Sequence, residues 1–495
     1  MGRKAYEVLL FAHGWYRSLL EGARISHGLA SIIIRNGKVV TSLENFEADV
    51  EIEDGVITRI SRSGLSGHPA DRVYNAEGKL LLPGCIDGHT HFEMPFMGTT
   101  TADDFLSGTA SAAAGGVTTV VDFAIQQSGG SMMQAVEAWK RKAVGKALID
   151  YSFHLIVRDL KATDTEEISN IVSAGVTSFK VFTTYRKEGL MLEDGGILDV
   201  MRRVGQLGGL VAVHAENNGI IESNVEKFLK ENMRSARYHR LSRPQEAERE
   251  AVQRAIYFSG IAGCPTYIVH LSSSEGRNAV KEGQLRGLPV FAETCPHYLI
   301  FDDSVYDRPD AANFVMSPPI KGKEDRAALW EGLREGVVKT VASDHADFDT
   351  HQKSLGKDDF TKIPNGVAGT EVILPVLFTE GYRKGRLSLN QVVQASSTNA
   401  ARAYNMFPRK GTIAVGSDGD IVVLDPAKKV RLTQENLHSK IDYSIYEDYV
   451  AEGYPVLTVS RGEIVSEDNQ ITAKPGRGVF VPRSGYMPHK SPLFD

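Results

Sequence analysis

Near both ends of the chain, short segments alternate apolar and polar residues in the way that predicts β-strands. Residues 31–60 follow this pattern, and an Asn-Gly pair at 36–37 and an Asp-Gly pair at 54–55 predict hairpin turns within them. The same alternation returns at residues 416–425 and 456–465. We therefore expect the two ends of the chain to build one small β-domain together.

The middle of the chain has a different pattern, in which short apolar runs alternate with segments of helical periodicity, such as residues 103–115, 132–146 and 245–258. Buried parallel strands separated by helices predict an α/β fold, a (β/α) barrel of seven or eight units. The predicted strands of this barrel cover residues 118–123, 149–156, 178–182, 210–214, 266–270, 290–294 and 338–343.

These patterns divide the chain into four parts. Residues 29–84 and 407–475 form the β-domain, and residues 85–406 form the barrel. Residues 1–28 precede the first strand as an extension, and their apolar run is too short for a signal-peptide core, so we assign them no targeting role. The tail, residues 476–495, carries three prolines and two arginines and is expected to be an extended arm that could contact a neighbouring subunit.

The composition excludes several classes of partner. Of the 495 residues, 42% are hydrophobic and the formal net charge is −6, so the chain offers no basic field for nucleic acid or an anionic membrane. Its apolar runs fall short of the roughly 20 residues that a membrane span requires. Three cysteines are too few for a disulfide framework and fit a reducing compartment. We predict a cytoplasmic protein without nucleic-acid or membrane partners.

The most informative motif is His89-Thr90-His91, which directly follows the apolar run at residues 80–88. Side chains two apart on a strand point to the same face, so both imidazoles would leave the strand end side by side, as a transition-metal ion requires. The alternative is two surface or helix-capping histidines. Barrel enzymes gather their chemistry at the carboxyl ends of the strands, which favours the metal site.

Three more candidate ligands stand at the ends of later predicted strands. His214 and His270 close apolar runs, and each alone would more often be a buried core histidine than a ligand. Two such strand ends beside a His-x-His motif favour metal binding. Asp344 follows the strand at 338–343 and could cap a helix, but among four histidines it is expected to be a ligand and a proton acceptor.

Lys180 is an unusual candidate, because it lies within the apolar run at residues 178–182. The ordinary expectation is a lysine whose ammonium group reaches solvent. An ammonium group beside divalent ions would be repelled, whereas burial lowers the lysine pKa and leaves a neutral amine that can react with carbon dioxide. The resulting carbamate, N6-carboxylysine, has two oxygens and could bridge two metal ions.

Ten short segments carry a resemblance to a known family. Five of them hold the candidate ligands: GCIDGHTH at 84–91, FKVF at 179–182, VHAE at 213–216, VHLS at 269–272 and SDH at 343–345. The others are MPF at 94–96, TADDF at 101–105, TCPHY at 294–298, SPP at 317–319 and PNG at 364–366. From about residue 30 to about residue 480 the sequence resembles the amidohydrolase superfamily, and within it the dihydropyrimidinase/hydantoinase family. Members often carry Gly and Pro where this chain has Cys85 and Gly88, a departure that touches local geometry but no ligand.

This resemblance implies a TIM-like (β/α)8 barrel, a flanking β-sandwich and, commonly, a homotetramer. It also implies two divalent metal ions per chain, most often zinc, bridged by a hydroxide and by the carbon dioxide-derived carbamate on Lys180. The two ligand sets share Lys180; His89, His91 and Asp344 complete one of them, and His214 and His270 complete the other.

The resemblance further assigns roles in the opening of a cyclic amide. The hydroxide attacks the ring carbonyl, and Asp344 takes its proton and delivers it to the leaving nitrogen. Tyr185 matches the family's tyrosine that stabilises the oxyanion, although a packed loop aromatic is the alternative. Ser317 and Asn365 match positions that recognise the cyclic imide, although Ser and Asn are also ordinary turn residues.

The expected substrate is a small neutral cyclic ureide: 5,6-dihydrouracil, dihydrothymine or a 5-monosubstituted hydantoin, opened to an N-carbamoyl amino acid. Dihydroorotases typically place an arginine two residues after the His-x-His motif, whereas residues 92–94 contain no cation here. Residues 92–96 could line the pocket for the ring substituent, or simply pack. Allantoinase or another cyclic ureide hydrolase stays an alternative. A non-enzymatic scaffold of the same fold is disfavoured, because all six ligand candidates are present.

Overall fold

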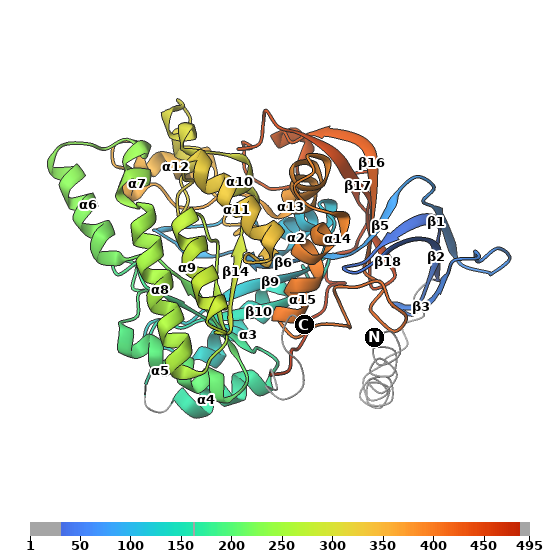
Figure 1. The fold of residues 1–495 in the computed structure, drawn as a ribbon, viewed down its shortest axis with the longest axis horizontal. Coiled ribbons are helices and arrows are strands. Elements are labelled where there is room, and N and C mark those ends of the chain that lie inside the picture. Colours follow the sequence, from blue (N-terminus) through green and yellow to red (C-terminus); the bar gives the residue numbers. More distant parts are fainter. Residues whose placement is uncertain (1–30, 162–163, 486–495) are drawn as a thin grey trace.

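The computed structural model of the protein describes residues 31–161 and 164–485, and the predicted extension at residues 1–28 lies outside this part of the chain. Figure 1 shows a barrel surrounded by helices and, to its side, a domain of strands coloured blue and orange-red, which come from the two ends of the sequence. Among the described residues, no helix is both long and apolar enough to cross a membrane.

The barrel consists of eight parallel strands that neighbour one another in chain order. An isolated parallel bridge between Thr90 and His345 brings the first strand beside the segment after the last one, so the ring is nearly closed. This arrangement confirms the predicted (β/α)8 barrel. The strands are β6 (Cys85–Thr90), β9 (Val117–Ile125), β10 (Asp150–Ile156), β11 (Ser178–Phe182), β12 (Leu210–His214), β13 (Thr266–Ile268), β14 (Val290–Thr294) and β15 (Thr340–Val341).

Helices cover the outside of the barrel, which is why its strands are continuous apolar runs rather than alternating ones. Every residue of β9, β11 and β12 is buried. The longest helix of the described residues, α8, begins with acidic side chains in its first turn. It is capped at its C-terminus by Gly263, whose φ of 61° is the left-handed conformation that favours glycine. The helices of the barrel are α2 (Phe105–Ala114), α3 (Met132–Ala143), α4 (Asp164–Ser173), α5 (Asp194–Gln206), α6 (Asn218–Lys230), α7 (Ala236–Ser242), α8 (Gln245–Ala262), α9 (Ser274–Leu285), α10 (Pro296–Ile300), α11 (Lys323–Glu335), α12 (Thr350–Lys353), α13 (Ile373–Val376), α14 (Leu389–Val393) and α15 (Asn399–Ala403).

The second domain is one nine-stranded sheet to which both ends of the chain contribute, as the sequence pattern predicts. Antiparallel pairing of Leu82 with Val422 joins the N-terminal strands to the C-terminal ones. Ile34, Val50 and Val459 are buried in a core of their own inside this sheet. The strands are β1 (Ile32–Val40), β2 (Asn45–Glu53), β3 (Val56–Ser61), β4 (Arg72–Asn75), β5 (Leu80–Pro83), β16 (Ile421–Arg431), β17 (Val450–Ser460), β18 (Glu463–Glu467) and β19 (Gln470–Ile471).

Of the two predicted hairpin turns, one is confirmed and one is wrong. Asp54 and Gly55 join β2 to β3 in an antiparallel hairpin. At Asn36 and Gly37, however, β1 continues, and its register against β2 shifts there as in a β-bulge. Asn36 has a φ of 58°, and a Cβ atom on residue 37 would lie 2.6 Å from Cγ of Leu81. The close approach of β5 explains the glycine, and the chain does not turn.

A buried ion cluster joins the barrel to the second domain. Nζ of Lys410 lies 2.9 Å from Oδ2 of Asp150, at the start of β10, and 2.7 Å from Oδ2 of Asp420, which precedes β16. Arg461, directly after β17, donates its Nε–H to Asp150 at 2.9 Å. Because Asp150 begins a barrel strand, this cluster lies at the amino ends of the strands, opposite the end that carries the histidines.

Residues 476–485 of the tail run along the same end of their own barrel. Phe480 pairs with Tyr151 in an isolated bridge, and the buried Arg483 donates an Nη1–H to Oγ of Ser178 at 2.9 Å. The rest of the tail lies outside the described residues, so an arm toward a neighbouring subunit stays a prediction.

Candidate metal centre and active site

A cavity of about 530 Å³ opens at the carboxyl ends of the barrel strands. Its walls come from the ends of several strands and from the loops that follow them. Eight of the nine predicted site residues line it, and the ninth, His89, is fully buried beside them. The eight are His91, Lys180, Tyr185, His214, His270, Ser317, Asp344 and Asn365.

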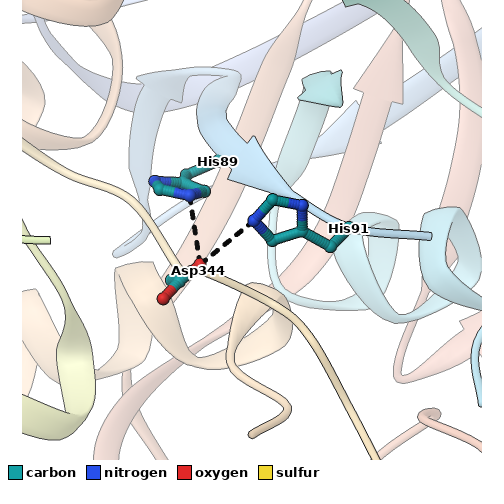
Figure 2. Close-up of side chains that lie close together, drawn as sticks. All are labelled: His89, His91 and Asp344. Atoms are coloured by element: carbon teal, nitrogen blue, oxygen red, sulfur yellow. Dashed lines mark ion pairs between the residues drawn. The ribbon is translucent and has the colours of Figure 1, made fainter. Parts of the chain in front are cut away.

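His89, near the end of β6, and His91, directly after it, converge on the carboxylate of Asp344, as Figure 2 shows. Oδ1 of Asp344 lies 3.0 Å from Nε2 of His89 and 3.4 Å from Nε2 of His91. Asp344 has a φ of 50°, so its backbone is in the left-handed region that aspartate tolerates better than most residues. Two imidazole nitrogens and a carboxylate oxygen within 4.8 Å of one another form a donor set that suits zinc.

Lys180 lies beside this donor set, and 1% of its surface is exposed. Its Nζ atom is 3.0 Å from Nε2 of His89 and 4.3 Å from the centre of the Phe123 ring. Burial lowers the pKa of the Lys180 ammonium to about 8, against the raising effect of Asp344 and Glu293. The neutral amine is the form that reacts with carbon dioxide, and a lowered pKa makes more of it available near neutral pH than in an ordinary lysine.

His214 and His270 occupy the other side of Lys180. Their ring centres are 4.5 Å apart, and that of His270 is 5.4 Å from the ring of His89. Burial lowers the pKa of both imidazoles, which favours the neutral form that binds metal. Nε2 of His214 is 2.9 Å from a carboxylate oxygen of Glu216, so its Nδ1 is left for a ligand. The residues therefore fit a pair of divalent ions around Lys180.

Tyr185, Ser317 and Asn365 form a connected polar group in the wall of the same cavity. Nδ2 of Asn365 donates to the hydroxyl of Tyr185 at 3.1 Å and to Oγ of Ser317 at 3.0 Å. Burial raises the pKa of Tyr185 to about 12, so its hydroxyl keeps its proton and can donate a hydrogen bond. Tyr185 also has a φ of 66°, an uncommon conformation for an aromatic residue.

Comparisons with known proteins agree with this arrangement. The model of the amidohydrolase family matches residues 80–465. The chain belongs to this family. A D-hydantoinase of Geobacillus stearothermophilus is 42% identical over 458 residues, which are 92% of this chain and 97% of that protein.

Solved structures of the family superpose closely on this chain. The dihydropyrimidinase from Brevibacillus agri NCHU1002 has a TM-score of 0.90 and 41% identity over 92% of this chain and 99% of its own. An L-hydantoinase (dihydropyrimidinase) from Arthrobacter aurescens has a TM-score of 0.84 and 30% identity over 91% of this chain and 99% of its own.

Within the amidohydrolase barrel, two carboxylates support the histidines, and the motif analysis assigns them no role. Glu293, on β14, contacts Nδ1 of His89 and accepts the backbone N–H of His270 at 3.2 Å. Glu216 accepts from His214 and, at 2.6 Å, from the buried Arg243. Although burial raises the pKa of Glu216, Arg243 and His214 lower it to about 2. The sequence does hold a signal for Glu293, because a charged residue inside an otherwise apolar strand needs a buried partner.

A second buried cluster in the amidohydrolase barrel supports the segment after Asp344. Nε2 of His345 lies 3.0 Å from Asp103 and 3.5 Å from Asp347. Burial lowers the pKa of His345, but the two carboxylates outweigh burial and raise it to about 10. This imidazolium ties the residue directly after Asp344 to Asp103 and Asp347.

Of the three apolar side chains predicted to line the cavity, Phe92, Met94 and Phe96, two line it and one packs in the core. Met94 and Phe96 line the cavity, and the ring centre of Phe96 is 5.4 Å from that of Tyr185. Phe92 is fully buried and packs edge-on against Phe105, so it belongs to the core. Two of the three apolar side chains therefore face the cavity, and the third packs in the core.

Proposed function

We propose that this amidohydrolase opens neutral cyclic ureides, 5,6-dihydropyrimidines or 5-monosubstituted hydantoins, to N-carbamoyl amino acids. The observation that carries the proposal is the convergence of His89, His91, Asp344 and Lys180 at one cavity with the Tyr185 hydroxyl. The names of the relatives, D-hydantoinase and dihydropyrimidinase, support the same substrate class.

Two divalent ions, with zinc as the best match to these nitrogen and oxygen donors, would be held by the six predicted ligands. When bound, they supply a nucleophilic hydroxide near neutral pH and polarise the carbonyl of the substrate. Lys180 would take part in holding them as its carbamate. The six ligands are His89, His91, Lys180, His214, His270 and Asp344.

The chain's own groups perform the remaining tasks. Asp344 accepts the proton of the nucleophile and returns it to the leaving ring nitrogen. The Tyr185 hydroxyl donates to the carbonyl oxygen as negative charge develops there. Ser317 and Asn365, already hydrogen-bonded to each other, present polar groups to the imide edge of the ring. Burial of the whole group strengthens each of these interactions by excluding water.

The charged side chains around the cavity support a substrate whose ring carries no charge. Residues 92–94, next to the metal ligands, contain no cation. Arg158 lines the cavity, but its guanidinium donates to the backbone carbonyls of Glu188 at 3.0 Å and Gly189 at 2.9 Å. Lys187 also lines the cavity, but its side chain is exposed to solvent. A substrate carboxylate would therefore lack a dedicated, buried guanidinium partner that would offset its desolvation.

One metal-loaded preparation should be assayed with dihydrouracil, a 5-monosubstituted hydantoin, allantoin and dihydroorotate. We expect the highest kcat/KM with dihydrouracil or the hydantoin. A higher kcat/KM with dihydroorotate would refute the neutral-ring assignment, and a preference for allantoin would make the protein an allantoinase. Absence of turnover with all four would refute the proposed activity.

Three further features belong to this proposal. A homotetramer rests on the family resemblance, a cytoplasmic location rests on the cysteine content, and domain boundaries after residues 84 and 406 rest on the sequence pattern. Light scattering on the purified protein would measure the oligomeric mass.

A further inference from the structure

Lys353, the last residue of α12, is buried to the same degree as Lys180, with 1% of its surface exposed. Its Nζ atom donates to three backbone carbonyl oxygens: Val315 at 2.8 Å, Pro364 at 2.8 Å and Gly366 at 2.7 Å. Within the described part of the chain, no carboxylate forms an ion pair with it. The side chain is therefore surrounded by carbonyl dipoles instead of a counter-ion.

These three carbonyls belong to the two segments that carry the polar wall of the cavity. Val315 stands two residues before Ser317, while Pro364 and Gly366 flank Asn365 on either side. The backbone N–H of Gly366 also donates to Val315 at 2.9 Å, so the segments touch directly at this point. Lys353 thus donates hydrogen bonds to the backbone of both segments.

The number of donors matches the number of acceptors. An ammonium group has three N–H donors, and all three are used at ordinary hydrogen-bond lengths. Removing a cation from water without an anionic partner is costly, so a residue of this kind is expensive as a simple filler of the core. The three hydrogen bonds that offset this cost all go to the two segments that carry Ser317 and Asn365.

The backbone is closely packed at Gly366, and the helix that carries Lys353 is firmly capped. Gly366 has a φ of 149°, and a Cβ atom there would lie 2.1 Å from the carbonyl oxygen of Ala346. On the other side, Asp349 and Gln352 cap α12 reciprocally, with N–H donations of 2.7 and 2.9 Å. Lys353 therefore extends from a capped helix end to a backbone segment that packs closely against Ala346.

We propose that Lys353 is a positioning residue for substrate binding, which sets the spacing between the Ser317 and Asn365 segments and hence the fit of the cyclic imide. This inference deepens the proposed function and depends on it. Lys353 forms no hydrogen bond or ion pair with any of the six predicted metal ligands, so its loss should weaken ring binding without emptying the metal site.

The test compares Lys353→Met with Lys353→Gln and with the wild-type enzyme. Methionine keeps the length of the stem and removes every donor, whereas glutamine keeps two N–H donors without charge. We expect kcat/KM for dihydrouracil or the hydantoin to fall roughly 10- to 100-fold in Lys353→Met, mainly through KM, and less in Lys353→Gln. Metal content should stay at the wild-type value. Amide hydrogen exchange at residues 315–317 and 364–366 should accelerate in both variants.

Lys410→Met is the matched control, because Lys410 is equally buried but lies at the opposite end of the barrel. It should lower the melting temperature while leaving the KM of the folded enzyme unchanged. Wild-type KM and wild-type exchange at both segments in Lys353→Met would overturn the proposal, as would a loss of metal that accounts for the whole effect. If Lys353→Met does not fold, the same two readouts on Lys353→Gln decide. Hydrogen exchange needs no substrate, so it separates this inference from a failure of the proposed activity.

Discussion

Glu293 lies against Nδ1 of His89, on the side of the imidazole ring away from Asp344. This contact leaves Nε2 of His89 with its lone pair directed at the donor set, because the proton is held at Nδ1. The carboxylate also accepts the backbone N–H of His270, so one side chain orients groups at both predicted metal positions. Ligand strength at this centre therefore depends on a residue that would bind no metal.

Replacing this carboxylate tests its role. Glu293→Gln should weaken metal affinity roughly 10- to 100-fold, the usual cost of losing an outer hydrogen-bond partner of a ligating histidine. Competition with a chromophoric chelator measures the affinity. Glu226→Gln, which alters an exposed carboxylate paired with Lys230, is the control and should bind metal normally. Unchanged affinity in Glu293→Gln would show that Glu293 only fills space.

Removing the Tyr185 hydroxyl tests its part in the chemical step. Tyr185→Phe keeps the ring that packs against Phe96 and should lower kcat roughly 10²–10³-fold, the cost of one oxyanion donor. Metal content should not change. Tyr257→Phe, on the exposed side of α8, is the matched control. Wild-type kcat in Tyr185→Phe would reduce Tyr185 to a packing residue.

Lys180 is predicted to carry a carbamate, and Lys180→Ala should lose most of the bound metal and the activity. Short carboxylates such as acetate or propionate, added with metal, should restore part of the activity by supplying the missing oxygens. Elemental analysis and turnover measure both effects. An unmodified Lys180 in a crystal of fully active, metal-loaded enzyme would contradict the carbamate.

The pKa of Lys180 gives this step a pH dependence. Burial lowers the pKa from its ordinary value to about 8, so the neutral amine accumulates as pH rises toward 8 and is nearly complete well above it. At constant dissolved carbon dioxide, the rate at which metal-free enzyme regains activity with zinc should rise with pH and level off above about 8. A rate that still climbs steeply at pH 9.5 would indicate an ordinary, unperturbed lysine.

The ion cluster at the other end of the barrel is predicted to act on stability alone. Lys410→Met leaves Asp150 and Asp420 buried without this partner and should lower the free energy of unfolding by about 3–5 kcal/mol. Chemical denaturation measures the change. Lys429→Met, which affects an exposed pair with Glu452, should cost less than about 1 kcal/mol. If both variants lose a similar amount of unfolding free energy, the cluster contributes no more to stability than an exposed ion pair.

Much of the architecture follows from local pattern. The apolar run that ends at His214 predicts β12 residue for residue, because a strand covered on both faces must be apolar along its whole length. Once the barrel is expected, the carboxyl ends of its strands bring His89, Lys180 and Asp344 to one side, and the motifs identify them as ligands. Asn36 and Gly37 mark the limit of such reasoning, since the same dipeptide serves a hairpin turn or a bulge.

The sequence by itself determined the barrel, the shared β-domain and the set of residues that could bind metal, because each depends on periodicity or on a short motif. Only the tertiary structure decided which groups support them. Glu293 is 204 positions from His89, and Lys353 reaches the Ser317 and Asn365 segments through carbonyls that any residue could supply. Such contacts leave no local signature, because they exist only after strands far apart in the chain have closed into one barrel.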